Sequence, residues 1–307
     1  MKKILITGGN GLLGQSLRLL IPKEKYEIIA TGLGTDRLKN HSQIYHPLDI
    51  SIQKDCEAIL SLYNPDIIIN TAAITNVDYC ELDQERCLNV NTNSINNFLF
   101  FCKKNNKKFI QLSTDFLFDG KSGPYSEEAK QKPVNYYGFS KMMAERIIIN
   151  ANLPNFSIIR TCLVYGYKND SNNILMWVKR KLDLNESLNI VDDQFRTPTL
   201  VFDLSKAIFQ IIENDLKGIY NISSGEYLSI FDFVCNIVNA FGYDKSLIQR
   251  CKSSKINQKA ERPKKSGLQV EKAMRDFDFL PTKMDVFFKS IKCKDFLSSE
   301  FAPVEKN

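Results

Sequence analysis

Tyr137 and Lys141 stand four residues apart, in a stretch whose continuation from Met142 to Asn150 is typical of a helix. Side chains at this spacing lie on one face of a helix. A nearby ammonium stabilises a tyrosinate and lowers the pKa of the phenol from about 10 toward neutral. We therefore interpret Tyr137 as a general acid for the reduction of a carbonyl group, with Lys141 beside it. The alternative is a surface pair without a catalytic role.

A hydroxyl group that could assist them follows the apolar run from Phe109 to Ser113. This run predicts a strand, and ligands bind at the carboxyl ends of parallel strands. The hydroxyl of Thr114 could hydrogen-bond the substrate oxygen and hold the carbonyl against the phenol. The alternative is a helix cap or turn made by Ser113 or Asp115.

Three glycines, Gly8, Gly11 and Gly14, follow the apolar segment from Lys3 to Thr7 and precede a predicted helix. At such a junction the early glycines make the tight turn and let backbone N–H groups approach a pyrophosphate, while the last lets the helix pack closely. The helix N-terminus then faces the anion. A purely structural turn is the alternative, but the position directly between strand and helix favours a dinucleotide site.

The stretch from Ala30 to Gly34, after the second predicted strand, contains no carboxylate, and Arg37 follows shortly after it. A carboxylate there would bind the ribose diol of NAD and repel a 2′-phosphate. Its absence permits NADPH, with NADH as the alternative. Arg37 is either a phosphate clamp or a solvated loop arginine.

Short apolar runs and amphipathic stretches alternate through the first half of the chain, which predicts an α/β fold with a Rossmann-type, doubly wound parallel sheet. Strands are expected at 3–7, 27–31, 67–70, 109–113 and 157–160, and helices at 12–20, 54–62, 88–104 and 136–150. The rhythm then loosens, which indicates a smaller mixed α/β substrate lobe. The expected division is a dinucleotide domain at 1–164 with a return segment near 191–210, a substrate lobe at 165–190 and 211–300, and a tail at 301–307.

The composition favours an ordinary globular protein: of 307 residues, 43% are hydrophobic and 25% are charged. No run approaches the roughly 18 apolar residues of a membrane span, and the N-terminal apolar stretch is too short for a signal peptide. We therefore expect a cytoplasmic protein. The net charge of +6 comes from scattered short runs rather than a basic stripe, so nucleic-acid binding is not indicated. Eight cysteines without a C-x-x-C pair and two loop histidines indicate no metal site.

Together these features resemble the extended short-chain dehydrogenase/reductase family, and within it the dTDP-4-dehydrorhamnose reductase branch. The resemblance covers nearly the whole chain. It is carried by Thr7 to Gly14, Asn70-Thr71-Ala72-Ala73, Val77 to Glu81, Ser113-Thr114-Asp115, Phe118-Asp119-Gly120, Tyr137 with Lys141, Arg160-Thr161, Val164-Tyr165-Gly166, Asp192-Asp193-Gln194, Thr197-Pro198-Thr199 and Arg262-Pro263.

The resemblance implies reduction of the C4 keto group of a nucleotide-linked 6-deoxy sugar, as in dTDP-L-rhamnose biosynthesis. It implies a catalytic set of Tyr137, Lys141 and Thr114. The cofactor would be bound by Gly8, Gly11, Leu12, Leu13, Gly14, Arg37, Asp49, Ile50, Ala72, Ala73, Thr75, Asn91, Tyr137 and Lys141. The substrate would be bound by Val77, Asp115, Asn173, Gln194 and Arg196. Family members commonly form dimers, which makes a homodimer one expectation.

Two residues depart from the enterobacterial form of the family. Leu163 stands where that form has a tryptophan that stacks on thymine, and Phe116 stands where it has a tyrosine. Both changes leave the reductase class in place but bear on which nucleotide and sugar are bound.

Three other functions share this fold. Sugar-nucleotide dehydratases carry an Asp-Glu pair after the catalytic threonine, whereas this chain has Asp115-Phe116, so elimination of water is disfavoured. A sugar-nucleotide epimerase stays open, because it needs only reversible hydride transfer. So does a non-catalytic NADP-binding regulatory subunit like that of methionine adenosyltransferase, which can retain the same catalytic residues.

Overall fold

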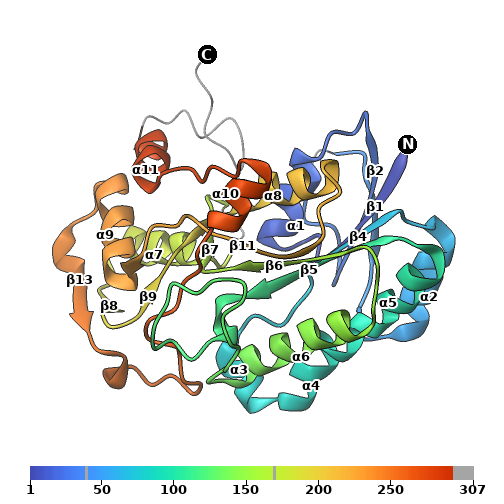
Figure 1. Cartoon of the computed structure of the whole chain (residues 1–307). Helices are drawn as coiled ribbons and strands as arrows, with labels where there is room; N and C mark the ends of the chain where they lie inside the picture. The colour runs from blue at the N-terminus through green and yellow to red at the C-terminus, as the bar shows by residue number, and fades with distance from the viewer. Residues whose placement is uncertain (39–40, 169–170, 293–307) are drawn as a thin grey trace.

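The central sheet of the computed structural model has parallel strands in the order β11-β6-β5-β4-β1-β2-β3 (Figure 1). The structure describes residues 1–38, 41–168 and 171–292. The strand order reverses at β1, which pairs with both β2 and β4, and ligands bind at such reversals. The strands are β1 (Lys2–Thr7), β2 (Tyr26–Gly32), β3 (Ile44–Pro47), β4 (Ile67–Asn70), β5 (Lys108–Thr114), β6 (Phe156–Thr161) and β11 (Gly218–Ile222).

Helices cover both faces of this sheet (Figure 1). One face carries α1 (Leu12–Leu20), α8 (Val201–Glu213) and α10 (Glu271–Phe277), and the other carries α2 (Gln53–Tyr63), α5 (Asn96–Asn105) and α6 (Tyr136–Asn150). Successive side chains of a strand point to opposite faces. In β4, Ile67 and Ile69 therefore join one core and Ile68 the other. Burial on both faces explains why the strands are continuous apolar runs.

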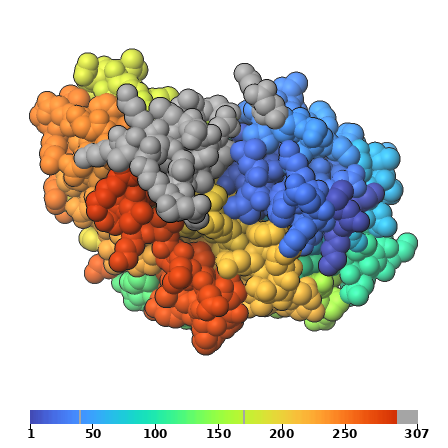
Figure 2. All heavy atoms as spheres, turned by 90° about the horizontal axis from the view of Figure 1, so that it is seen from above, coloured from blue at the N-terminus to red at the C-terminus, as the bar shows by residue number. Residues whose placement is uncertain are grey.

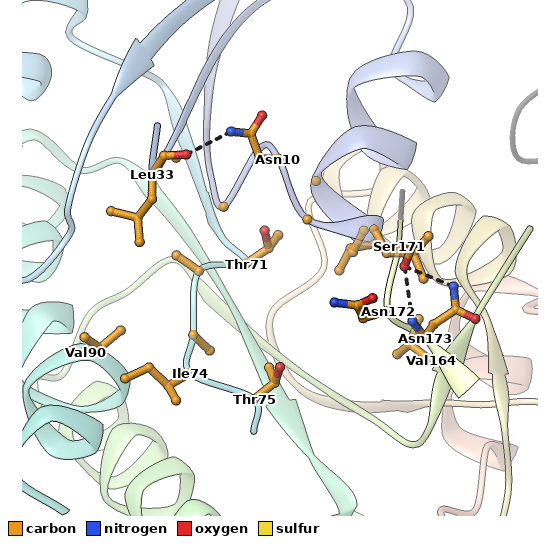
Figure 3. A pocket seen from close by; sticks show the side chains of 18 of the residues that line it. Asn10, Leu33, Thr71, Ile74, Thr75, Val90, Val164, Ser171, Asn172 and Asn173 are labelled. Carbon is orange, nitrogen blue, oxygen red and sulfur yellow. Dashed lines mark hydrogen bonds between the residues drawn. The ribbon is translucent and has the colours of Figure 1, made fainter. Parts of the chain in front are cut away.

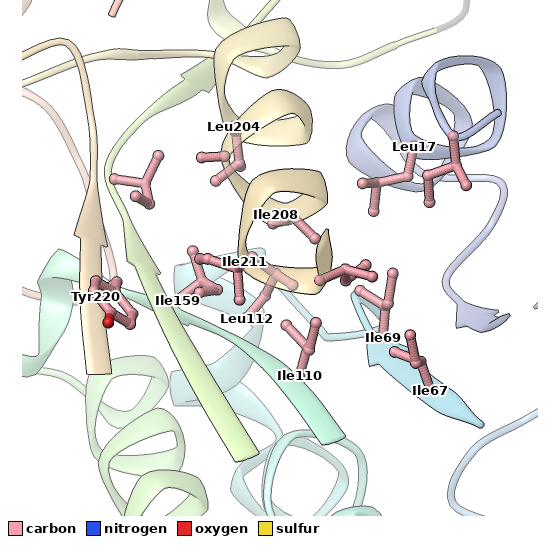
Figure 4. Close-up of a cluster of buried hydrophobic side chains, with 14 of the residues drawn as sticks. Leu17, Ile67, Ile69, Ile110, Leu112, Ile159, Leu204, Ile208, Ile211 and Tyr220 are labelled. Carbon is pink, nitrogen blue, oxygen red and sulfur yellow. The ribbon is translucent and has the colours of Figure 1, made fainter. Parts of the chain in front are cut away.

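Helix α8, from the return segment, seals one of these cores. Leu204, Ile208 and Ile211 recur at helical spacing and pack over the strands, with Ile110 of β5 and Ile159 of β6 among their neighbours (Figure 4). Seen from above, α8 lies between α1 and α10 (Figure 2). The chain thus returns to the first domain to complete its core.

A separate apolar core lies under α7, α9 and α11, away from the two cores on the faces of the central sheet. Three small strand pairs surround it: β7 with β10 and β8 with β13, both parallel, and β9 with β12, antiparallel. This is the smaller lobe. Its elements are β7 (Val164–Tyr165), α7 (Ile174–Asp183), β8 (Leu188–Val191), β9 (Phe195–Arg196), β10 (Thr199–Leu200), β12 (Leu228–Ser229), α9 (Ile230–Phe241), β13 (Ile248–Cys251) and α11 (Met284–Lys292).

The doubly wound sheet with a smaller mixed lobe is confirmed, but several details differ from expectation, among them strand β3, which the sequence did not predict. The predicted helix at 88–104 is wrong: α4 (Gln84–Asn91) ends there and α5 begins after the short turn η1 (Asn93–Ile95). Strand β11 pairs with β6 in the central sheet, although residues 211–300 were assigned to the substrate lobe. The expected tail at 301–307 lies outside the described residues.

Candidate active site

The turn between β1 and α1 is tight and depends on its glycines. Gly11 N–H donates to the Gly8 carbonyl at 2.8 Å, and Gly8 has a φ of +68°, which favours glycine. A Cβ on Gly8 would lie 2.8 Å from the Ala72 nitrogen, and one on Gly14 would clash with the Gly8 carbonyl oxygen. The sequence expectation that these glycines serve the turn and the helix packing agrees with this geometry.

A cleft of about 1010 Å³ begins at this turn and runs to Tyr137. Figure 3 shows Leu33, Ile74 and Val90 on one side of it and Val164 with Asn173 on the other. Of the residues predicted from the sequence, those that line the cleft are Gly8, Gly11, Leu12, Leu13, Gly14, Arg37, Asp49, Ile50, Ala72, Ala73, Thr75, Thr114, Tyr137 and Asn173.

Asn10 organises one end of the cleft by folding the loop after β2. Its side-chain nitrogen donates to the carbonyls of Leu33 at 3.1 Å and Thr35 at 2.9 Å, and its oxygen accepts from the Arg37 N–H at 2.9 Å. Arg37 consequently lines the cleft. The neighbouring Asp36 does not, because its carboxylate pairs with buried Arg18 at 2.7 Å.

Asp49 lies at the same end and is fully engaged. It accepts from the Ser51 N–H at 2.9 Å and hydroxyl at 2.6 Å, and from Arg86 at 2.7 Å. Partial burial raises the pKa of Asp49, but the hydrogen bonds from Ser51 and Arg86 outweigh it and hold the pKa below its usual value. Asp49 is therefore a carboxylate at neutral pH.

Thr114 and Tyr137 meet where β5 ends and α6 begins. The side chain of Asn135 caps α6 by accepting from the Gly138 N–H at 2.8 Å. A Cβ on Gly138 would clash with the Phe116 carbonyl, so glycine lets the helix approach this loop. The approach places the Tyr137 phenol in hydrogen-bonding contact with the Thr114 hydroxyl.

The electrostatics of Tyr137 and Lys141 differ from the expectation. Burial raises the pKa of Tyr137 well above its usual value, while the hydrogen bond from Thr114 acts in the opposite direction. Burial also lowers the pKa of Lys141 to about 8. Desolvation disfavours the charged form of both groups. The phenol is thus protonated at neutral pH rather than shifted toward tyrosinate.

Lys141 and Asn91 are buried and are not among the residues that line the cleft. The Asn91 amide accepts from the Ile74 N–H at 2.8 Å and donates to the Ile74 carbonyl at 3.0 Å and the Ser140 hydroxyl at 3.1 Å. It therefore shapes the loop at Ile74 and Thr75, which does line the cleft.

The substrate residues expected from the sequence are divided. Asn173 lines the cleft and caps α7, accepting from the Leu175 N–H at 3.1 Å. Gln194 is buried beside Gln258, with 3.3 Å between the side-chain nitrogen and oxygen. Outside the cleft lining are Val77, Asp115, Gln194 and Arg196.

Several residues that line the cleft were not predicted as site residues from the sequence. Ser113 is one: it is buried, and within the described ranges its hydroxyl has no hydrogen-bond partner. Its position next to Thr114 was the available signal, as the glycine motif was for Asn10. The remaining residues are Asn10, Gly32, Leu33, Leu48, Thr71, Ile74, Tyr79, Arg86, Val90, Thr161, Leu163, Val164, Ser171, Asn172 and Ile174.

The cleft fits a dinucleotide on two observations of its own. Gly11, at the N-terminus of α1, borders the cleft, and a Cβ there would meet only the Gly8 carbonyl oxygen. Within the described part of the chain the Ser113 hydroxyl is unpartnered where the cleft reaches Thr114. Among the residues that the structure describes, no cluster of His, Cys, Asp and Glu is arranged to hold a metal ion. None of the described helices combines the length and apolarity needed to cross a membrane.

Known proteins are similar to this chain over most of its length. The family described as RmlD substrate binding domain matches residues 1–289. A dTDP-4-dehydrorhamnose reductase from Aggregatibacter actinomycetemcomitans is 29% identical, over 95% of this chain and 99% of the relative. The crystal structure of a dTDP-4-dehydrorhamnose reductase from Bacillus anthracis in complex with NADP has a TM-score of 0.82 at 27% identity, covering 97% of this chain and 100% of that one. Methionine adenosyltransferase 2 subunit beta from Danio rerio is 25% identical, over 88% of this chain and 84% of the relative.

Proposed function

The chain belongs to the RmlD substrate binding domain family, and we propose from this premise that it is an NADPH-dependent reductase of a nucleotide-linked 4-keto-6-deoxy sugar. The observation that carries the proposal is the meeting of Thr114 and Tyr137 in the wall of the cleft that starts at the glycine turn. The relatives named dTDP-4-dehydrorhamnose reductase support this substrate class.

The side chains have distinct tasks in this reaction. NADPH supplies the hydride that reaches the keto carbon. The Thr114 hydroxyl donates to the carbonyl oxygen and holds it beside the phenol. Tyr137, protonated at neutral pH because its pKa is raised, gives its proton to that oxygen as negative charge forms there. Charged Lys141 favours the tyrosinate that this transfer leaves.

The loop after β2 favours NADPH over NADH. It places Arg37 in the lining of the cleft, while the Asp36 carboxylate pairs with Arg18. A guanidinium suits the 2′-phosphate of NADPH, which a free carboxylate would repel. The remaining cofactor residues proposed are those of the glycine turn with Asp49, Ile50, Ala72, Ala73 and Thr75 along the cleft, and Asn91 and Lys141 behind it.

A non-catalytic regulatory subunit is the second candidate, because the chain is also similar to methionine adenosyltransferase 2 subunit beta. Such a subunit would bind NADPH without consuming it. An epimerase would return the nicotinamide to its starting state after each turnover, so it would show no net oxidation. Net NADPH oxidation therefore separates the reductase from the other two, and conversion of the nucleotide sugar without net oxidation separates the epimerase from the regulatory subunit.

The test is NADPH oxidation, followed by absorbance, with dTDP-4-keto-6-deoxyhexose generated together with its 3,5-epimerase. We expect turnover that falls roughly 10²–10⁴-fold in Tyr137→Phe, with NADPH affinity retained by nicotinamide fluorescence. Tyr136→Phe is the matched control, because Tyr136 precedes it on α6 outside the cleft lining. Tight NADPH binding without oxidation would contradict the reductase, and it would support the regulatory subunit if the sugar is also not converted. Full turnover in Tyr137→Phe would contradict the assigned general acid.

Two further expectations accompany this function. We propose that the enzyme acts in the cytoplasm, where nucleotide sugars are made, and as a homodimer. The first is tested by fractionation of the source cells, and the second by light scattering on the purified protein. A monomer that retains full activity would contradict the dimer.

A further inference from the structure

Asp115 directly follows the catalytic Thr114, yet it points away from the cleft into a buried polar cluster. The cluster is made of Asp115, Arg196 and Ser266, each of which is at most 3% exposed. Asp115 Oδ2 accepts from the Ser266 hydroxyl at 2.6 Å, and the Arg196 Nε lies 3.6 Å from the same oxygen. The other oxygen, Oδ1, lies 3.4 Å from the Thr114 Oγ1, which is long for a hydrogen bond between two oxygens.

The groups around Asp115 come from both parts of the molecule. Thr114 ends β5 of the central sheet, whereas Arg196 lies on β9 of the smaller lobe. Ser266 is joined to β9, because its N–H donates to the Phe195 carbonyl at 3.2 Å. The carboxylate therefore connects the smaller lobe to the hydroxyl that faces the substrate.

The negative charge of the Asp115 carboxylate must be offset by neighbouring groups. Negative charge develops on the substrate oxygen next to Thr114 during hydride transfer, and a bare buried carboxylate one residue away would oppose it. The Ser266 hydroxyl and the Arg196 guanidinium offset that charge from the far side. Arg196 is itself fixed, since it lies over the Phe116 ring at 5.3 Å and donates to the Phe195 carbonyl at 2.7 Å.

We propose that Asp115 is a positioning residue: Ser266 and Arg196 hold its carboxylate from the smaller lobe, which fixes the end of β5 so that the Thr114 hydroxyl can donate to the substrate oxygen. This inference rests on the proposed reductase function. It differs from the sequence expectation that Asp115 and Arg196 contact the substrate, because neither lines the cleft. Ser266 enters the assignment from the structure alone.

Ser266→Ala tests the proposal with the smallest change in the cluster. We expect the single-turnover rate of NADPH oxidation with dTDP-4-keto-6-deoxyhexose to fall roughly 10-fold, since a misplaced catalytic hydroxyl slows the chemical step. KM for the sugar and the Kd for NADPH should stay near their wild-type values. Ser266→Thr keeps the hydroxyl and should restore most of the rate.

Ser223→Ala is the matched control, because Ser223 is also buried and donates to the nearby Leu268 carbonyl at 3.2 Å but does not contact Asp115. It should leave the rate unchanged. Asp115→Asn should slow the reaction at least as much as Ser266→Ala. In the double variant, loss of the Ser266 hydroxyl should add nothing further if it acts through Asp115.

Equal slowing by Ser266→Ala in the wild-type and Asp115→Asn backgrounds would overturn the proposal. An effect confined to KM would do the same, because it would make the cluster a substrate contact. An inactive wild-type protein would contradict the proposed function and this inference together. An active wild type with an unaffected Ser266→Ala variant would contradict the inference alone.

Discussion

Lys141 is an ionisable group buried inside the protein, and its chemistry follows from that burial. Desolvation lowers its pKa to about 8, while Glu145, Cys87 and Cys80 act in the opposite direction. Its spacing from Tyr137 was evident in the sequence. The burial that governs both pKa values was not, because it is produced by segments distant in the chain.

A pH profile of kcat/KM should show this group, since kcat/KM reports ionisations of the free enzyme. Lys141 carries its proton below its folded pKa and loses it above. We therefore expect kcat/KM to fall as pH rises through about 8. Lys141→Arg keeps the charge at all these pH values. The kcat/KM of this variant should therefore not fall as pH rises through about 8. A fall of kcat/KM at the same pH in Lys141→Arg would show that a group other than Lys141 titrates there.

Gly11 and Gly14 have different tasks within one turn. Gly11 has a φ of −74°, which any residue adopts, and its Cβ would lie 3.2 Å from the Gly8 carbonyl oxygen. A Cβ on Gly14 would strike the backbone of Gly8 and lie 2.7 Å from the Gly9 Cα. Gly11 therefore borders the cofactor cleft with room for a side chain, whereas backbone atoms leave no room for one at Gly14.

Gly11→Val should therefore weaken NADPH binding at least about 10-fold, while its melting temperature stays close to that of the wild type. Gly14→Val should destabilise the fold by about 1–3 kcal/mol, because overpacking moves the backbone. Fluorescence titration and thermal unfolding of both variants check this. A Gly14→Val protein as stable as the wild type would contradict the packing role.

The interruption between α4 and α5 is the clearest feature at the scale of the elements. Thr92 leaves helical geometry with φ of −121° and ψ of −62°, and its hydroxyl donates to the Ser140 carbonyl of α6 at 2.8 Å. The helical pattern of the sequence continues through this point without glycine or proline. Contacts with α6 decide the break, so local sequence could not predict it.

Asn91 tests how this break supports the cofactor site. Asn91→Ala removes the amide that holds Ile74 and Ser140, so we expect NADPH affinity to fall about 10-fold although Asn91 lies outside the cleft lining. Titration by fluorescence measures the change. Asn93→Ala is the control, because its side chain contacts only the Asn89 side chain in the described hydrogen bonds. Unchanged affinity in Asn91→Ala would contradict the supporting role.

At the scale of the whole molecule, the chain beyond β13 returns across to α3 (Val77–Leu82). Arg262 and Asp78 form two hydrogen bonds of 2.5 and 2.8 Å, and the Ala260 N–H donates to Asp78 at 2.9 Å. The hydrogen bond from Arg262 holds the pKa of Asp78 below its usual value. This bidentate pair joins the two parts of the molecule near the cleft.

Arg262→Gln should raise KM for the sugar several-fold and leave NADPH affinity unchanged, because it loosens this connection and not the glycine turn. The expected loss of stability is only about 1 kcal/mol, since Asp78 is partly exposed and solvent screens the pair. Steady-state kinetics and thermal unfolding measure both. Arg275→Gln, which removes an exposed arginine paired with Asp276, is the control. An unchanged KM would contradict the role of the pair.

The sequence by itself determined the parallel sheet, the glycine turn and the residue types of the catalytic set. These depend on local periodicity and on short motifs, and α1, β4 and α6 were predicted with the bounds observed. Tertiary structure alone decided the break at Thr92, the place of β11 in the central sheet, and the burial of Asp115 with Ser266. Each of these depends on partners more than 40 residues away in the chain, and such contacts leave no local pattern in the sequence.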